Sequence, residues 1–330
     1  MTRLAGLAQL AVPAALVVAV GLGSTLVSAA NEIYFLDALI SVAIVVAIYV
    51  FVGNSGVLSF GQVSFVAVGA FAAGVMTIPL ESKTGVLPQL FPILRDHTIG
   101  NVASLALAAA AGGVLAFLVG LPLMRLSGLA AGIATFAVLE ITHNLLREWT
   151  KIGPGATTLS LVPETTGALQ ATIGALIATC AAFAYQRSRL GRQLRASRED
   201  AAAARGVGVS VHRQRLWAFI VSGALAGFAG GLLVHELGSI TTEQVYLELT
   251  FLTLAMLVVG GVSSLWGAVV GALAVSGLNS FLIEAEDGVA VVDLPSGSRL
   301  ILLGAIMATV LILRPSGITR GREFSFPGLR

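Results

Sequence analysis

Apolar residues fill this chain in long uninterrupted stretches and do not alternate with polar ones. A helix needs about 20 mostly apolar residues to cross a membrane. Uncharged stretches of that order lie at residues 4–31, 98–124, 165–186 and 216–234. Residues 38–80 carry no charged residue or histidine, which leaves room for two helices joined by the Gly-Asn-Ser-Gly turn at residues 53–56. The pattern predicts helices that cross a lipid bilayer.

Three further stretches complete this pattern. One, at residues 128–146, is interrupted by Glu140 and His143. The last, at residues 300–313, is short, but an arginine at each end can extend toward the membrane surface. As a helix, residues 249–283 would be about 50 Å long, too long for one upright span and short for two. Their middle is rich in glycine and serine, so we expect two short helices or a re-entrant pair whose irregular backbone is buried in protein.

These stretches predict an all-α polytopic membrane protein with about eight transmembrane helices plus a broken or re-entrant helix pair. The charges of the loops predict its orientation. Residues 186–215 hold eight arginines and the tail after Arg314 is also basic, so we expect this loop and both termini in the cytoplasm. The loops at 235–248 and 284–298 are acidic and are expected outside. The chain is read as a single transmembrane domain, residues 1–330.

Composition supports the membrane class and excludes others. Hydrophobic residues make up 56% of the chain and charged residues 11%, less than half their usual share. The mean hydropathy is +0.93. A soluble protein this apolar could not cover its surface with polar groups, which excludes a soluble enzyme, a disordered segment and a nucleic-acid-binding module. The single cysteine, Cys180, excludes a disulfide framework.

Glu140 is the most informative polar residue within the apolar stretches. A carboxylate inside a span is costly and should face protein or a water-filled path. His143 and Asn144 follow at helical spacing on the same face. Two interpretations remain open: a polar patch on a solute path or on an interface with another membrane protein, or a helix–helix hydrogen bond that fixes packing. Ser59 and Gln62 could similarly offer polar groups where two spans meet, although turn chemistry explains them equally well.

The basic loop contains a candidate contact with a soluble partner. We expect a short helix from about Glu199 to Arg205, because acidic residues lie at its start and a glycine follows its end. Such a cytoplasmic helix is suited to transmit motion to or from a partner. The alternative is that the arginines fix topology and bind anionic membrane lipid.

Several motifs in order along the chain resemble the permease subunits of branched-chain amino acid ABC importers, closest to the LivM type. The segments that carry the resemblance are residues 56–62 (GVLSFGQ), 134–141 (ATFAVLEI), 188–230, 260–267 (GGVSSLWG) and 314–317 (RPSG). Together they extend over residues 38–317. Two positions depart from the pattern: Ala201 stands where the family often has a further Glu, and residues 152–155 (IGPG) replace the usual T-G-G.

The resemblance implies a subunit that works with a second homologous permease, two cytoplasmic ATPases and an external solute-binding protein in the cell inner membrane. No G-x-x-x-x-G-K-[ST] run occurs, so this chain is expected to bind no cofactor, and ATP and Mg would lie on the partner ATPases. Its expected ATPase-coupling residues are Gly191, Arg198, Glu199, Asp200 and Gly208. Its expected solute-path or permease-interface residues are Ser59, Gln62, Thr135, Glu140, His143 and Asn144. The expected function is import of branched-chain amino acids or similar small polar solutes by alternating access.

Two rival functions remain open. One is an ion-coupled secondary transporter that uses Glu140 and works without partners. The other is an intramembrane enzyme, which would need a catalytic constellation, but neither H-E-x-x-H nor G-x-S-x-G occurs. The histidines lie apart and show no metal-ligand spacing, so no metal site is expected.

Overall fold

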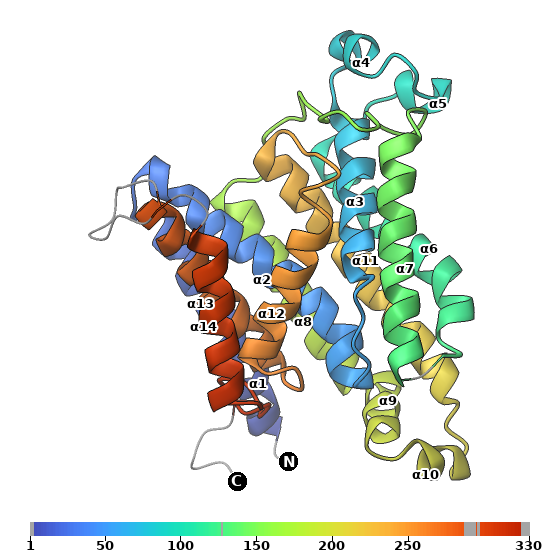
Figure 1. The fold of residues 1–330 in the computed structure, drawn as a ribbon, viewed down its shortest axis with the longest axis vertical. Helices are drawn as coiled ribbons and strands as arrows, with labels where there is room; N and C mark the ends of the chain where they lie inside the picture. Colours follow the sequence, from blue (N-terminus) through green and yellow to red (C-terminus); the bar gives the residue numbers. More distant parts are fainter. Residues whose placement is uncertain (1–2, 127, 287–294, 296–297, 325–330) are drawn as a thin grey trace.

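A computed structural model describes residues 3–126, 128–286, 295 and 298–324. Over these residues the secondary structure consists of helices, with no β-strand. Figure 1 shows a bundle of helices with short helices at both ends. We call the end with α4 (Leu80–Val86) and α5 (Pro92–Arg95) the upper end, and the end with α9 (Arg189–Glu199) and α10 (Ala201–Gly206) the lower end.

Ten apolar helices form the body of the bundle within the described residues. They are α1 (Arg3–Ser24), α2 (Ala29–Ser55), α3 (Gln62–Thr77), α6 (Asn101–Leu123), α7 (Gly128–Glu148), α8 (Ala168–Arg187), α11 (Val211–Leu237), α12 (Leu247–Gly260), α13 (Leu265–Glu286) and α14 (Ser298–Leu313). Six of them, α2, α6, α7, α8, α11 and α13, are long and apolar enough to cross a membrane. The other four contain shorter apolar segments. The predicted all-α polytopic class is confirmed.

The paired segment at residues 249–283 differs in part from the prediction. It forms two helices that run to the lower end and back, as expected (Figure 1). Only α12 is short, with 14 residues, whereas α13 has 22 because its helix continues beyond the uncharged stretch to Glu286. The chain reverses between them at Gly261, whose positive φ of 124° favours glycine.

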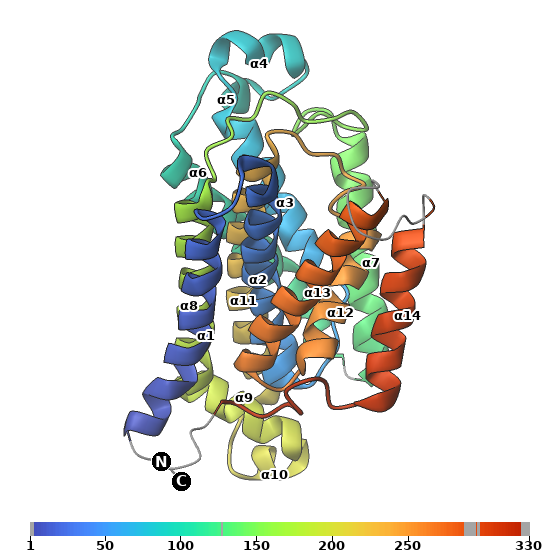
Figure 2. The same cartoon turned by 90° about the vertical axis from the view of Figure 1, so that its left-hand side faces the viewer.

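Helix α2 lies at the centre of the bundle. Every residue from 38 to 55 is buried, and α2 contacts α1, α8, α11, α12 and α13 (Figures 1 and 2). The sequence shows that α2 has no polar face for water, but it does not distinguish a position against lipid from this central one. The predicted turn at residues 53–56 is wrong. The helix continues through Ser55 and ends at Gly56, with φ 71°, because tertiary partners satisfy its polar residues (below).

Helices α3, α6 and α11 pack closely through small residues. A Cβ atom at Gly227 would collide with the carbonyl oxygen of Ala108, and one at Gly230 with that of Val66. Without a hydrophobic driving force between helices in lipid, such close backbone contact is a main source of association. These glycines therefore hold α11 against both neighbours.

Candidate functional site

The lower end carries two short helices where the sequence predicted one. Helix α9 ends at Glu199, and α10 begins after Asp200. The Asp200 carboxylate accepts hydrogen bonds from the backbone N–H groups of Ala202 (2.8 Å) and Ala203 (2.9 Å), which caps α10. These bonds hold the pKa of Asp200 below its usual value. The predicted helix from about Glu199 to Arg205 is therefore present as α10, two residues later at its start and one at its end, whereas α9 before it was not predicted.

One arginine of α9 anchors it to the bundle. The Arg195 guanidinium donates to Asn54 Oδ1 (2.6 Å), to the Tyr49 hydroxyl (2.5 Å) and to Gln186 Oε1 (2.8 Å). Tyr49 also donates to Gln186 Oε1 (2.7 Å), and both Tyr49 and Asn54 are fully buried in α2. Arg195 therefore joins α9 to α2 and α8. It was not among the predicted site residues.

The segment after α14 adds a second connection at this end. The Glu323 carboxylate accepts from the backbone N–H groups of Leu265 (2.9 Å) and Trp266 (3.3 Å), the first residues of α13. A negative charge is favourable at a helix N-terminus. The same carboxylate lies 3.9 Å from Arg195 Nη2. Glu323 thus links α9 to the start of α13.

The five predicted coupling residues fall into two groups. Gly191 is buried, and a Cβ there would collide with the carbonyl oxygen of Tyr185, so it allows α9 to pack on α8. Arg198 donates to the carbonyl oxygen of Gly53 (2.8 Å) at the end of α2.

The other three, Glu199, Asp200 and Gly208, lie on the exposed surface. Val207, which is 81% exposed, lies beside them at the end of α10. Arg198 and Gly206 are also exposed in this region; the name lower surface is used for the exposed residues Glu199, Asp200, Ala202, Ala203, Arg205, Val207 and Gly208. It combines charged side chains with one large exposed apolar side chain, Val207.

A second cluster lies on α7, where the sequence predicted it. Glu140 accepts a hydrogen bond from Asn144 Nδ2 (2.7 Å) and another from the Tyr246 hydroxyl. The His143 ring stacks on the Tyr246 ring, with centroids 3.9 Å apart. His143 Nε2 also lies 3.4 Å from Glu243 Oε1. We call these five residues the polar patch.

The polar patch is exposed although α7 is long and apolar enough to span a membrane. Glu140 and Asn144 are both solvent-accessible in the isolated chain. A carboxylate in the middle of a span is too costly to leave against lipid tails. This exposure favours the interpretation that another protein or a water-filled path lies beside α7 in the membrane.

Two members of the polar patch, Glu243 and Tyr246, were missed by sequence reasoning. They lie in the loop before α12, about 100 residues from α7 along the chain, so no local spacing connects them to Glu140. The hydrogen bond to Glu140 raises the pKa of Tyr246 to about 12. Tyr246 therefore stays a hydrogen-bond donor at neutral pH.

The remaining predicted path residues lie inside the bundle. Thr135 Oγ1 accepts from the backbone N–H of Phe60 (3.2 Å), and Gln62 Oε1 accepts from Ser222 Oγ (3.0 Å). Ser59 is buried, and its hydroxyl has no hydrogen-bond partner among the described residues. The three residues surround the break between α2 and α3 and are not part of the polar patch.

An aromatic cluster connects this break to the polar patch. The Phe60 ring meets Phe136 of α7 and Phe251 of α12 edge to face, each with centroids 6.4 Å apart. Phe136 lies one helical turn from Glu140, and Phe251 follows Tyr246 by five residues. The facing sides of α7 and α12 therefore carry polar groups next to aromatic rings.

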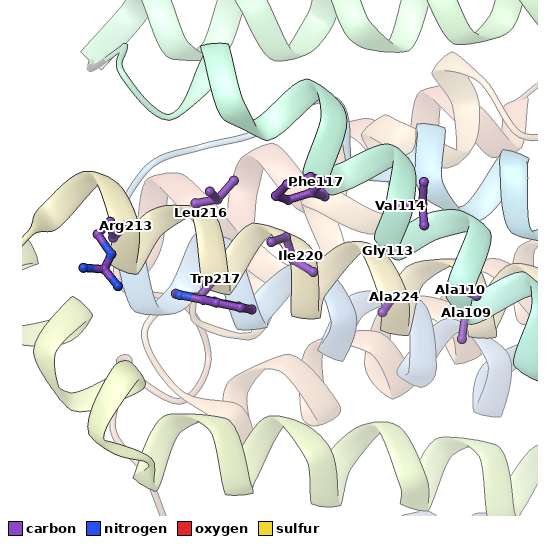
Figure 3. A pocket seen from close by; sticks show the side chains of 10 residues that line it. All are labelled: Ala109, Ala110, Gly113, Val114, Phe117, Arg213, Leu216, Trp217, Ile220 and Ala224. Carbon is purple, nitrogen blue, oxygen red and sulfur yellow. The ribbon is translucent and has the colours of Figure 1, made fainter.

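The groove in Figure 3 lies elsewhere, between α6 and α11. Its volume is about 660 Å³, and small and aliphatic side chains line most of it, with Arg213 and Trp217 at one end. None of the predicted site residues lines it. A polar solute would find few partners there, so we do not consider it a solute site. The described residues also contain no group of three or more His, Cys, Asp or Glu that could hold a metal.

Comparison with known proteins places these features in a family context. Residues 30–311 match the family described as branched-chain amino acid transport system / permease component. The chain is 28% identical to the high-affinity branched-chain amino acid transport system permease protein LivM of Escherichia coli (strain K12), over 82% of this chain and 65% of that protein. It thus spans about two thirds of the length of that relative.

Other relatives align with less than half of the chain. A probable LivH permease of Methanocaldococcus jannaschii is 31% identical over 40% of this chain and 41% of its own length. The autoinducer 2 import system permease protein LsrC of Enterobacter sp. is 33% identical over 40% of this chain and 38% of its own. No solved structure matches.

Proposed function

The chain belongs to the family of branched-chain amino acid transport permease components, and from this premise we propose that it is the membrane-spanning subunit of an ATP-driven importer. Its cargo would be branched-chain amino acids or similar small polar solutes. A second permease would pair with it in the cell inner membrane, two ATPases would bind ATP and Mg, and an external protein would deliver the solute. The family match over residues 30–311 is the observation that carries this proposal.

The lower surface would be the docking site of an ATPase. It is exposed, it combines charged and apolar side chains, and α9 connects it to the core of the bundle. Arg195 contacts α2 and α8, and Glu323 contacts both Arg195 and the start of α13. A displacement of α9 by the ATPase would therefore move the lower ends of three membrane helices together. Alternating access requires such a rigid connection between the energy source and the spans.

The polar patch and the aromatic cluster would line the solute path or the contact with the second permease. The cluster offers carboxylate acceptors at Glu140 and Glu243 and donors at Asn144 and Tyr246. Amino acids carry both an ammonium and a carboxylate group, so both kinds of partner suit them. The partner permease would complete the path on the open side of α7.

The decisive experiment is gentle purification of this chain from its native membrane, with identification of what comes with it. We expect two ATPases and a second permease, and ATP-dependent uptake when the complex is placed in vesicles. The variant Val207→Asp puts a charge into the apolar part of the lower surface and should release the ATPases. The exposed Arg189, at the start of α9 and outside the lower surface, provides the control Arg189→Gln. A solitary protein that transports without ATP would contradict the proposal and favour an ion-coupled carrier.

A further inference from the structure

Arginine side chains surround a cavity at the lower end, on the side of α1 and α8. Its volume is about 720 Å³. Helices α8 and α9 and the segment after α14 supply most of its lining, namely Gln186, Arg187, Arg192, Arg195, Arg322 and Glu323. Figure 2 shows α1 and α8 side by side, with α9 below them. The cavity is separate from the lower surface and from the polar patch.

The charges in this cavity are not balanced. Four guanidinium groups face one carboxylate, Glu323, which also accepts from two backbone N–H groups of α13. Arg195 already donates to three side chains of α2 and α8. Among the described residues, the side chains of Arg192 and Arg322 have no ion pair or hydrogen bond, and Arg187 only lies over the Phe183 ring at 5.0 Å. Within the described part of the chain, these three positive charges therefore lack a counterion.

The residue type indicates what kind of ligand would neutralise these charges. Guanidinium groups bind phosphate through two parallel N–H···O bonds and are less strongly hydrated than the lysine ammonium. Arg192 and Arg322 are both exposed, so a ligand can reach them from outside the bundle. The chemistry favours an anionic group with several oxygen atoms, such as a phosphate.

The position of the cavity indicates the source of the phosphate. Gln9 also lines the cavity, at the start of the apolar segment Gln9–Ser24 of α1, and Arg187 is the last residue of α8. The cavity thus lies where two apolar helices end, at the depth of lipid headgroups. The outward side of α8 is apolar, with Ile173 and Ile177 both exposed. A phospholipid could lay its acyl chains along this side while its headgroup entered the cavity.

We propose that this cavity binds the phosphate of an anionic phospholipid. The bound phosphate would bring Arg187 of α8, Arg192 of α9 and Arg322 of the C-terminal segment around one centre. Because Arg195 lines the same cavity and anchors α9, the lipid would strengthen the attachment of α9 to the bundle. Lipid composition would then influence how firmly the lower surface is held.

The test uses the full chain, purified in detergent and stripped of lipid. Native mass spectrometry measures the binding of phosphatidylglycerol, with phosphatidylcholine and inorganic phosphate as separate arms. We expect phosphatidylglycerol to bind more tightly than phosphatidylcholine. The double variant Arg192→Gln/Arg322→Gln should weaken its binding by roughly tenfold or more, the effect of losing charge-assisted hydrogen bonds. Both arginines are exposed and unpaired among the described residues, so the variant should fold like the wild type.

The control is Arg125→Gln, an exposed arginine between α6 and α7 that does not line the cavity. It should bind phosphatidylglycerol as the wild type does. Equal loss in the control and the double variant, or no loss in either, would overturn the proposal. If inorganic phosphate binds to the wild type and displaces phosphatidylglycerol, and the double variant loses both, the cavity is a general phosphate site and its lipid assignment is wrong.

Discussion

No sequence pattern distinguishes Arg195 from the seven other arginines of residues 186–215, although it makes the contacts that anchor α9. Its partners in α2 lie about 140 residues earlier in the chain, so only the folded structure shows which arginine they bind. From the sequence, Asn54 was interpreted as part of a turn, and Tyr49 was not distinguished from the apolar residues around it. The sequence did not show that Arg195 is the hydrogen-bond donor to both side chains.

The variant Arg195→Gln should therefore destabilise the folded protein. It removes three charge-assisted hydrogen bonds and leaves the buried groups of Tyr49 and Asn54 without their donor. We expect a loss of about 2 kcal/mol in the free energy of unfolding, measured by denaturation in detergent. In Arg189→Gln, which changes an exposed arginine of the same helix, stability should stay the same. Equal effects of the two variants would show that Arg195 is not an anchor.

The stability of the first turn of α10 depends on pH because the Asp200 carboxylate caps it. Its pKa is lowered in the folded state, so the capping contribution is present at neutral pH and is lost as the pH falls through that lowered pKa. The protection of the first α10 amides against hydrogen exchange, relative to the intrinsic exchange rate at each pH, should fall severalfold in acid and, in Asp200→Ala, at neutral pH. Asparagine also caps helices. Asp200→Asn should therefore keep slow exchange but lose the pH dependence, and an unchanged acid response in this variant would contradict the assignment.

The polar patch allows the two interpretations of Glu140 to be separated. Glu140→Gln keeps the size of the side chain and its acceptor oxygen but removes the charge. If the patch lines the solute path, uptake by the intact complex should fall severalfold, mainly through a higher KM. Tyr246→Phe, which keeps the ring stacked on His143, should reduce uptake less. Unchanged uptake by an intact Glu140→Gln complex would leave this residue only a packing role.

At the scale of elements, the apolar helices and the break between α12 and α13 were predicted well, but the end of α2 was not. Long uncharged stretches specify spans almost by themselves, because the membrane imposes the length. The end of α2 shows the limit of that reasoning. Gly-Asn-Ser-Gly is typical of a turn, yet Asn54 donates to the carbonyl oxygen of Val50 and accepts from Arg195, so the helix continues. Tertiary contacts thus override a local signal.

The end of α2 at Gly56 can be tested directly. Its φ of 71° disfavours any residue with a side chain, and a Cβ there would lie 2.9 Å from Arg198 Cγ. Gly56→Ala should lower the free energy of unfolding by roughly 1–2 kcal/mol, measured as a lower Tm in detergent. The matched control is Gly277→Ala in α13, where a Cβ would meet no atom within 4 Å. If both substitutions behave alike, backbone conformation does not determine where α2 ends.

At the scale of the whole molecule, the positive loop predicts which end faces the cytoplasm. A cysteine introduced at the exposed Thr84 of α4 should react with a membrane-impermeant thiol reagent in right-side-out vesicles. A cysteine at Ser210, near the lower surface, should react only after the vesicles are opened. Both belong in a Cys180→Ser background, since Cys180 is exposed. Labelling in the opposite order would reverse the predicted orientation.

The core around α2 and the polar patch on α7 differ in how much of each this chain supplies. The core around α2 is complete within this chain, and the sequence predicted its class from composition and pattern. The polar patch on α7 is not complete, because it leaves a carboxylate on an open face. Its spacing on one helix was predictable from the sequence, whereas Glu243 and Tyr246, which also belong to it, were not.

The central position of α2 has a consequence for how the protein is made. Synthesis runs from the N-terminus, so α2 enters the bilayer before α8, α11 and α13 exist. Lipid must surround it during that interval. The uncharged surface from residue 38 to 55 makes this tolerable, since lipid tails solvate it as well as protein does. As the core assembles, later helices thus replace the lipid that first surrounds α2. The core is complete only after the last of these helices has been translated.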